Sequence, residues 1–301
     1  MKKNNYTVLN QIYKPHKYTI KNHAVILYCN DRNVVIKGKN SDLKPIYDYM
    51  KACNFENYIP IIDENRDNYY VFEYKDDLYF PSEERNRDFI KLVSLLHAKT
   101  TYKKNVDLNL YDELYNNIIN NINYLKDKYS NLYDEIFPRK YYKPHESLFM
   151  DYYSKLNNNL LFLTEETNNW YNLVSNKKNQ RVSLIHNNLD SSHFIKSDKD
   201  YLISFDYAKI DTPILDLVSL YKKMYDDIDF KTMLDEYLYH YSLYDDELKL
   251  FFILISIPED IELENNNYVN TKKIYNLINY MNKTEELIRP YYANNEEKEK
   301  T

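Results

Sequence analysis

Residues 182–220 carry the polar side chains whose types and spacing could support chemistry. A hydrophobic run ends at His186, and a short polar loop follows it. A second apolar run over 201–205 predicts another strand, which leads directly to Asp206. Carboxylates bind divalent cations or accept protons, and imidazoles bind transition metals. This stretch is therefore the first candidate for an active site.

Two kinds of metal site can be drawn from these residues. Because side chains alternate along a strand, Ser204 and Asp206 are expected on the same face, where Asp206 could reach a cation. His193 with Asp190 or Asp206 would instead suit zinc or manganese, since imidazole and carboxylate are ligands for both. The residues themselves leave the two alternatives open.

The elements that must position these side chains fall into two blocks. Residues 1–75 alternate β-branched or aromatic runs with turn residues. This pattern predicts a mostly antiparallel sheet with one helix over 42–53. The strands are expected at 18–20, 24–28, 34–37, 58–62 and 69–74, with turns at 30–33 and 63–68.

From Ser82 onward the pattern is helical, with Ser82 expected as the N-cap of the first helix. Further helices are expected over 107–129, 144–175, 214–226, 230–243, 246–256 and 271–287. The two strands of the polar stretch interrupt them, and residues 292–301 read as a flexible charged tail. A β-rich block followed by a larger helical block predicts the α+β class.

Composition excludes several classes of function. The 40 Lys and Arg residues against 46 Asp and Glu give a formal net charge of −6, which argues against nonspecific binding to nucleic acid or anionic membranes. One glycine in 301 residues excludes every glycine-rich phosphate loop. The two cysteines form no zinc or redox pattern, and no signal peptide or long apolar run is present, which favours a cytoplasmic protein.

Several motifs, in order along the chain, resemble the aminoglycoside phosphotransferase/choline kinase superfamily, and within it the CotS-like spore-coat kinases of low-GC Gram-positive bacteria. The matching segments are Val34-Val35-Ile36-Lys37, Phe72-Glu73-Tyr74, Leu95 to Thr100, Phe205 to Lys209 with Asp211-x-Pro213 and Asp216-Leu217, and Asp246 to Phe252 with Pro258-Glu259. The resemblance implies a two-lobed protein-kinase-like fold, with a β-rich N-lobe over 1–75 and a helical C-lobe over 76–291. The catalytic-loop region would then be 182–220.

The resemblance also implies cofactors and roles. ATP and Mg²⁺ are the cofactors of the superfamily. Lys37 stands at its nucleotide-binding lysine, and Glu73 and Tyr74 stand at the interlobe hinge that contacts the nucleotide. His186 and Asp216 are expected to be structural, bracing the catalytic loop. No glutamate in the helix over 42–53 is available to pair with Lys37.

The catalytic loop departs from the superfamily pattern His-Gly-Asp-Leu-His-x-x-Asn, which corresponds here to residues 186–193. Asn188 stands where the resemblance places the aspartate that accepts the proton of the substrate hydroxyl, and an amide cannot act as a base. His193 stands at the position of a metal-binding asparagine. Asp190 is the neighbouring carboxylate that could act as a displaced base.

The second strand departs as well. The superfamily pattern Ile-Asp-Phe or Ile-Asp-Trp is Ile203-Ser204-Phe205 here, so Ser204 stands at the position of the aspartate that binds Mg²⁺. Magnesium requires hard, preferably anionic oxygen, and a neutral hydroxyl replaces it poorly. Asp206 is the candidate substitute ligand.

Three functions fit these observations. The first is a degenerate phosphotransferase, a pseudokinase that acts by binding a protein partner or a small hydroxylated ligand, with weak or Mg²⁺-independent nucleotide binding. The second is an active ATP-dependent small-molecule kinase that uses Asp206 for the metal and Asp190, or no base, for the proton. The third, by analogy with the spore-coat proteins, is a structural protein associated with spores.

Overall fold

The computed structural model describes residues 12–21, 24–63, 68–106 and 108–298. The chain divides into two compact units, and two long segments of sequence contribute to each. The sheet unit comprises the chain up to Thr101 together with Ser183–Asp211, and the helical unit comprises Tyr102–Val182 and the chain from Thr212 onward. This division differs from the lobe boundary expected after residue 75, because residues 76–101 and 183–211 group with the sheet.

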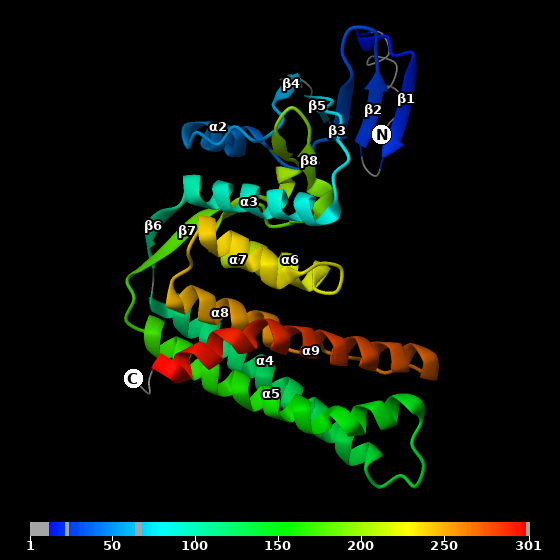
Figure 1. The fold of residues 1–301 in the computed structure, drawn as a ribbon, viewed down its shortest axis with the longest axis vertical. Coiled ribbons are helices and arrows are strands. Elements are labelled where there is room, and N and C mark those ends of the chain that lie inside the picture. Colours follow the sequence, from blue (N-terminus) through cyan, green and yellow to red (C-terminus); the bar gives the residue numbers. More distant parts are fainter. Residues whose placement is uncertain (1–11, 22–23, 64–67, 107, 299–301) are drawn as a thin grey trace. The chain divides into compact units, whose positions relative to one another are not determined.

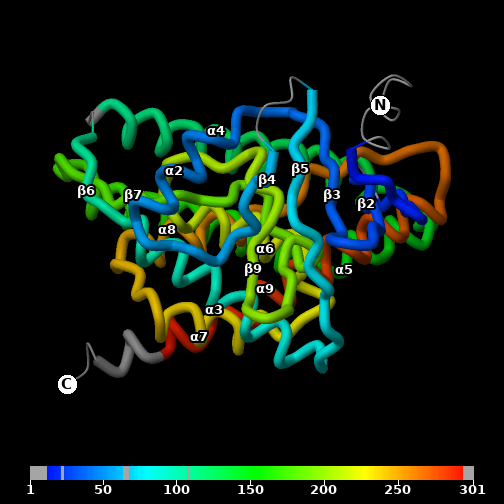
Figure 2. Tube along the Cα trace, turned by 90° about the horizontal axis from the view of Figure 1, so that it is seen from above, coloured from blue at the N-terminus to red at the C-terminus, as the bar shows by residue number. Residues whose placement is uncertain are grey.

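The sheet unit is built on five antiparallel strands in the order β1-β2-β3-β5-β4 (Figures 1 and 2). Their bounds are Lys17–Lys21 for β1, Ala24–Tyr28 for β2, Val34–Gly38 for β3, Ile61–Asp63 for β4 and Tyr69–Glu73 for β5, and α2 spans Lys44–Ala52. Figure 2 shows β4, β5, β3 and β2 in sequence across the sheet. Alternate residues of β2 and β3 are buried, and together with two residues of β5 they form one apolar cluster of Val25, Leu27, Val34, Ile36, Tyr69 and Val71.

The same unit contains α3 (Ser82–Thr100) and the segment that holds the candidate site. The last residues of β7 (Asn179–Ile185) pair with β10 (Lys209–Asp211), and β8 (Phe194–Lys196) pairs with β9 (Asp200–Leu202). Short 3₁₀ turns at Ser191–His193 and Phe205–Tyr207 lie between these strands. A bridge from Tyr58 to Leu202 joins this segment to the N-terminal part of the unit.

The helical unit consists mainly of long helices. Its elements are β6 (Tyr102–Asn105), which pairs with the first residues of β7, α4 (Leu108–Ile136), α5 (Pro144–Val174), α6 (Ile214–Met224), α7 (Phe230–His240), α8 (Asp245–Ser256) and α9 (Asn267–Lys298). Helices α4 and α5 form a hairpin, and α5 also packs against α8 and α9 (Figure 1). Large side chains, among them Trp170, Tyr237 and Phe251, are fully buried between the helices.

Several expected boundaries are corrected by the structure. Ser82 is the first helical residue of α3 rather than its cap, and Pro81 occupies the cap position. Helix α4 continues to Ile136 instead of ending at 129. Helix α9 continues to Lys298, through most of the segment expected to be a tail. Three expectations fall partly or wholly on residues outside the described ranges. They concern the turn at 63–68, the end of the C-terminal tail and the absence of a signal peptide at the N-terminus.

Across the described ranges, no helix combines the length and the apolar character that crossing a membrane requires.

Glu166 of α5 links three helices of the helical unit. Lys249 of α8 donates to its Oε2 at 2.5 Å and the hydroxyl of Tyr292 of α9 donates to the same oxygen at 2.6 Å, while Asn169 donates to Oε1 at 3.0 Å. Burial by itself raises the pKa of Glu166, but these hydrogen bonds outweigh it and hold the pKa below its usual value.

We expect Glu166→Gln to flatten the acid sensitivity of the protein. A lowered folded-state pKa contributes stability at neutral pH that is lost as the pH falls through that pKa. The variant should therefore be less stable than wild type at neutral pH and should lose less stability on acidification. Urea unfolding at a series of pH values between neutral and acidic measures both effects, and parallel curves for the two proteins would contradict the assignment.

Candidate functional site

Lys37, on β3, meets the residues that follow β9. Its Nζ donates to the Ser204 hydroxyl at 3.3 Å and forms an ion pair with Oδ2 of Asp206. The Lys37 side chain is 20% exposed and that of Asp206 is 5% exposed, so the pair is largely shielded from water. The partner of Lys37 is therefore Asp206, 169 residues away in the sequence, and not an acid of α2.

The backbone explains how Ser204 and Asp206 reach the same lysine. The second strand was expected over 201–205, with both side chains on one face, but β9 ends at Leu202. Ser204 has φ 69° and ψ 46°, in the left-handed region, and the 3₁₀ turn Phe205–Tyr207 follows it. The strand alternation proposed from the sequence is thus wrong, and a turn brings the two side chains together instead.

Asp206 also has an oxygen that the protein does not use. Its Oδ1 is enclosed and has no hydrogen-bond partner among the residues that the structure describes. Tyr47 of α2 lies nearby, with its ring edge-on to Phe205 at 6.3 Å. Burial, reinforced by the Asp206 carboxylate, raises the pKa of Tyr47 well above its usual value, which keeps its hydroxyl protonated.

This arrangement can be compared with what ATP and Mg²⁺ require. Magnesium is often held through one or two carboxylates, with waters and substrate phosphates completing its shell. The enclosed Oδ1 of Asp206 is one such oxygen, and Lys37 beside it could contact a phosphate. In the described part of the chain no group of three His, Cys, Asp or Glu side chains is arranged to hold a metal by itself. Oδ1 of Asp206 is thus the oxygen of this arrangement that would be available to a magnesium ion arriving with a nucleotide, and its role as a metal ligand stays a prediction.

The loop after β7 is folded around two histidines. His186 is fully buried, its Nε2 donates to the Ile203 carbonyl at 2.8 Å, and its ring lies 5.1 Å from that of Phe205. The next residue, Asn187, has φ 58° and stands where the superfamily pattern has glycine. Asparagine is among the residues that tolerate the left-handed region, so the turn forms without glycine.

Hydrogen bonds of the polar residues that follow shape the loop. Nδ1 of His193 donates to the Asn188 carbonyl at 2.9 Å, and its ring lies 5.2 Å from that of His186. Oδ1 of Asp190 accepts from the Ser192 amide at 2.9 Å and so caps the 3₁₀ turn Ser191–His193. Neither the Asn188 amide nor a carboxylate engaged in capping has the properties of an efficient base.

Glu73 and Tyr74, the residues expected at the hinge, lie at the end of β5. The Glu73 carboxylate is 3.5 Å from the Arg32 guanidinium and 3.7 Å from Lys75 Nζ. The Tyr74 ring meets the Tyr28 ring edge-on at 6.0 Å. Burial raises the pKa of Tyr74, so its hydroxyl is a donor at neutral pH. Their predicted nucleotide contacts stay predictions.

Asp216 belongs to the helical unit, not to the sheet unit that holds the other site residues. It is fully buried in the first turn of α6, where the positive end of the helix dipole stabilises a carboxylate. Its charge contributes to the raised pKa of Tyr237 on α7, after the larger effects of burial and of Tyr241. Its expected bracing of the catalytic loop stays a prediction.

Two features were missed from the sequence. Tyr47 was not named as a site residue from the sequence, although it lies beside Phe205 and Asp206. A cavity beside Trp170 in the helical unit had no motif at all. The one available signal was that Trp170 is the single tryptophan of the chain.

A β-sheet unit and a helical unit with this order of elements define a kinase-like, two-lobed α+β fold, as the sequence predicted. No protein-family model and no curated protein matches the chain. Among solved structures, an aminoglycoside phosphotransferase from Alicyclobacillus acidocaldarius is similar with a TM-score of 0.64 and 9% identity, over 94% of this chain and 93% of that chain. At this identity the likeness establishes the fold.

Two further solved structures are similar over nearly their full length. A choline/ethanolamine kinase family protein from Mesorhizobium loti has a TM-score of 0.48 and 10% identity, over 95% of this chain and 94% of that chain. A choline kinase from Streptococcus pneumoniae has a TM-score of 0.45 and 14% identity, over 93% of this chain and 90% of that chain.

Proposed function

We propose that the protein is a degenerate phosphotransferase that acts by binding rather than by phosphoryl transfer. The observation that carries the proposal is the contrast within the sheet unit. Lys37 is held in a shielded ion pair with Asp206, as a phosphate-binding group would be, whereas the position of the base is the amide of Asn188. Phosphoryl transfer needs a positioned substrate hydroxyl and a neutralised phosphate. With an amide at position 188, no base stands at the position expected to accept the proton of that hydroxyl.

The nucleotide would be bound weakly, through Lys37, and without a strict requirement for Mg²⁺. Ser204 offers only a neutral hydroxyl, and that hydroxyl already accepts from Lys37. The functional partner would be another protein or a small hydroxylated ligand. The resemblance to spore-coat kinases supports a cytoplasmic or spore-associated setting in a low-GC Gram-positive bacterium.

A second candidate, an active small-molecule kinase, is favoured by one observation. The enclosed Oδ1 of Asp206 is an anionic oxygen without a partner among the described residues, beside the lysine expected to contact phosphate. A loose phosphoryl-transfer transition state places little demand on a base, so the loss at Asn188 alone would not prevent reaction. In this alternative the magnesium ion depends on Asp206.

A thermal-shift titration with ATP, with and without Mg²⁺ or Mn²⁺, tests the proposal. A ligand at about ten times its Kd stabilises the folded state by about 1.4 kcal/mol, so we expect a rise of a few degrees in Tm. The rise should be equal with and without the metal, and Lys37→Ala should abolish it. Lys21→Ala, which removes an exposed lysine from β1 of the same unit, is the matched control and should behave as wild type.

Activity measurements decide between the two candidates. If the purified protein hydrolyses ATP or phosphorylates a small hydroxylated compound, and Lys37→Ala abolishes that activity, the binding proposal is wrong. A metal-dependent thermal shift that Asp206→Asn removes would favour the kinase in its place.

A further inference from the structure

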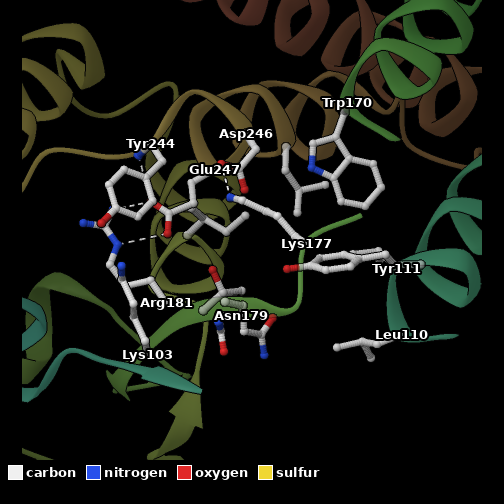
Figure 3. A pocket seen from close by; sticks show the side chains of 15 residues that line it. Lys103, Leu110, Tyr111, Trp170, Lys177, Asn179, Arg181, Tyr244, Asp246 and Glu247 are labelled. Carbon is white, nitrogen blue, oxygen red and sulfur yellow. Dashed lines mark hydrogen bonds and ion pairs between the residues drawn. The ribbon is translucent and has the colours of Figure 1, made fainter. Parts of the chain in front are cut away.

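The helical unit contains a cavity of about 370 Å³, which is within the size range of small-molecule sites (Figure 3). Residues of β6, α4, α5, β7 and α8 and of the segment before and at the start of α6 line it, and all of them belong to this one unit. None of the residues proposed above to contact a nucleotide or a metal is among them. The cavity is therefore a separate candidate site.

One wall of the cavity presents aromatic rings with unused hydrogen-bond donors. Trp170 and Tyr111 meet edge-on at 6.2 Å. In Figure 3 the nitrogen edge of the indole and the Tyr111 hydroxyl both face the space between the labelled side chains. Neither group has a hydrogen-bond partner among the described residues. Burial, together with the carboxylates of Asp246 and Glu247, raises the pKa of Tyr111 to about 12, so its hydroxyl keeps its proton at neutral pH. The indole N–H of Trp170 can only donate.

On the opposite side of the cavity, the guanidinium of Arg181 already has hydrogen-bond partners within the protein. Nε of Arg181 donates to Oε1 of Glu247 at 3.0 Å, and its terminal nitrogen donates to Oε2 of Glu247 and to the Ser242 carbonyl. The guanidinium also lies 4.5 Å from the ring centre of Tyr241 and 4.1 Å from that of Tyr244. The ion pair holds the two side chains of this wall in place, and Arg181 neutralises the charge of Glu247.

The remaining charges leave the cavity positive. Lys177 forms an ion pair with Asp246 at 2.5 Å. Lys103 on β6 lies directly opposite Arg181 on β7, and within the described ranges no carboxylate pairs with it. Like charges opposite each other across two strands are destabilising. Three cationic and two acidic side chains line the cavity, a formal surplus of one positive charge that an anion would offset.

We propose that this cavity binds a small planar ring that carries a carboxylate. The ring would lie beside the cavity-facing edges of Trp170 and Tyr111, and the carboxylate would accept from the exposed ammonium of Lys103 and from the unused donors of the aromatic wall. A cationic ring would meet the positive surplus, and a neutral ring would leave it uncompensated.

Trp170 provides a direct readout, because it is the only tryptophan and its emission can be excited apart from that of the 35 tyrosines. The full-length protein is titrated with benzoate, benzyl alcohol and benzylamine, which share a ring and differ in charge. We expect a saturable change of Trp170 emission with benzoate, and binding at least about tenfold weaker for the other two. Tighter binding of benzylamine or benzyl alcohol, or no binding of benzoate, would overturn the proposal.

Calorimetric titration of variants with benzoate identifies the groups that bind it. Lys103→Ala and Tyr111→Phe should each weaken binding by about tenfold, the effect of losing one hydrogen bond to a charged group. Lys272→Ala removes an equivalent charge from the exposed surface of α9, outside the cavity, and should leave the affinity unchanged. Equal losses in Lys103→Ala and Lys272→Ala would show that only the net charge of the protein matters, and an unchanged affinity in Tyr111→Phe would show that its hydroxyl is not used; either result contradicts a built site. Unchanged unfolding curves confirm that each variant is folded.

Discussion

Replacing Asn188 and Ser204 together by aspartate is expected to raise the ATP turnover of the purified protein by about 10²-fold or more. A positioned general base contributes about 10²–10⁴-fold to such reactions. Asn188→Asp restores a carboxylate at the base position. Ser204→Asp adds an anionic oxygen beside Lys37 and Asp206. The backbone accepts the second change, because Ser204 has φ 69° and aspartate is among the residues that tolerate this region.

The two single variants are the controls for this experiment. Either alone should give less than the double variant, since the base and the metal ligand act on different parts of the reaction. The measurement is release of ADP with Mg²⁺ present, with Lys37→Ala added to the double variant as the inactive reference. Turnover in the double variant no faster than in wild type would show that these two positions are not what limits the site.

Glu247→Ala is expected to destabilise the helical unit by about 3–5 kcal/mol, because removing one partner leaves a buried charge uncompensated. The Arg181 and Glu247 side chains are each 9% exposed and form two parallel hydrogen bonds. Glu247 also accepts from the Tyr244 amide at 2.9 Å, which caps the start of α8. The same substitution therefore removes an ion pair and a helix cap.

Urea unfolding followed by circular dichroism measures the loss. The matched control is Glu285→Ala, which breaks ion pairs with Lys155 and Arg289 at side chains that are 38–71% exposed. Pairs at such exposure contribute about 0–1 kcal/mol. If the two variants lose equal stability, burial does not distinguish the two pairs and the expectation for Glu247 is wrong.

Several strands of the sheet unit could be predicted because the residue pattern that identifies each one lies within the strand itself. The strands β2, β3 and β5 have β-branched and aromatic residues at strand spacing, and the structure has them where they were expected. The strands β6, β8 and β10 have three or four residues each, which is too short for any periodicity to be recognised. They form because neighbouring strands offer them partners.

Three residues of the candidate site were named from the sequence, but their arrangement in space was not predicted. Lys37, Ser204 and Asp206 were all named, but an extended strand was the reason given for the proximity of Ser204 and Asp206, and no contact of either with Lys37 was predicted. The strand instead ends at Leu202, and Ser204 adopts a left-handed conformation that its own sequence does not signal. The pairing of Lys37 with Asp206 spans 169 residues, and no local pattern carries such a contact.

The sheet unit has a consequence for the timing of folding during synthesis. Its two parts are separated by Tyr102–Val182, which is 81 residues of the helical unit. At about 5–20 residues per second, the ribosome needs roughly 4–16 s to pass from one part to the other. Until Leu202 and Asp206 leave the ribosome, Tyr58 lacks its bridge and Lys37 lacks its counterion. The N-terminal part of the sheet unit therefore lacks these contacts during the time in which the ribosome synthesises the α4–α5 hairpin.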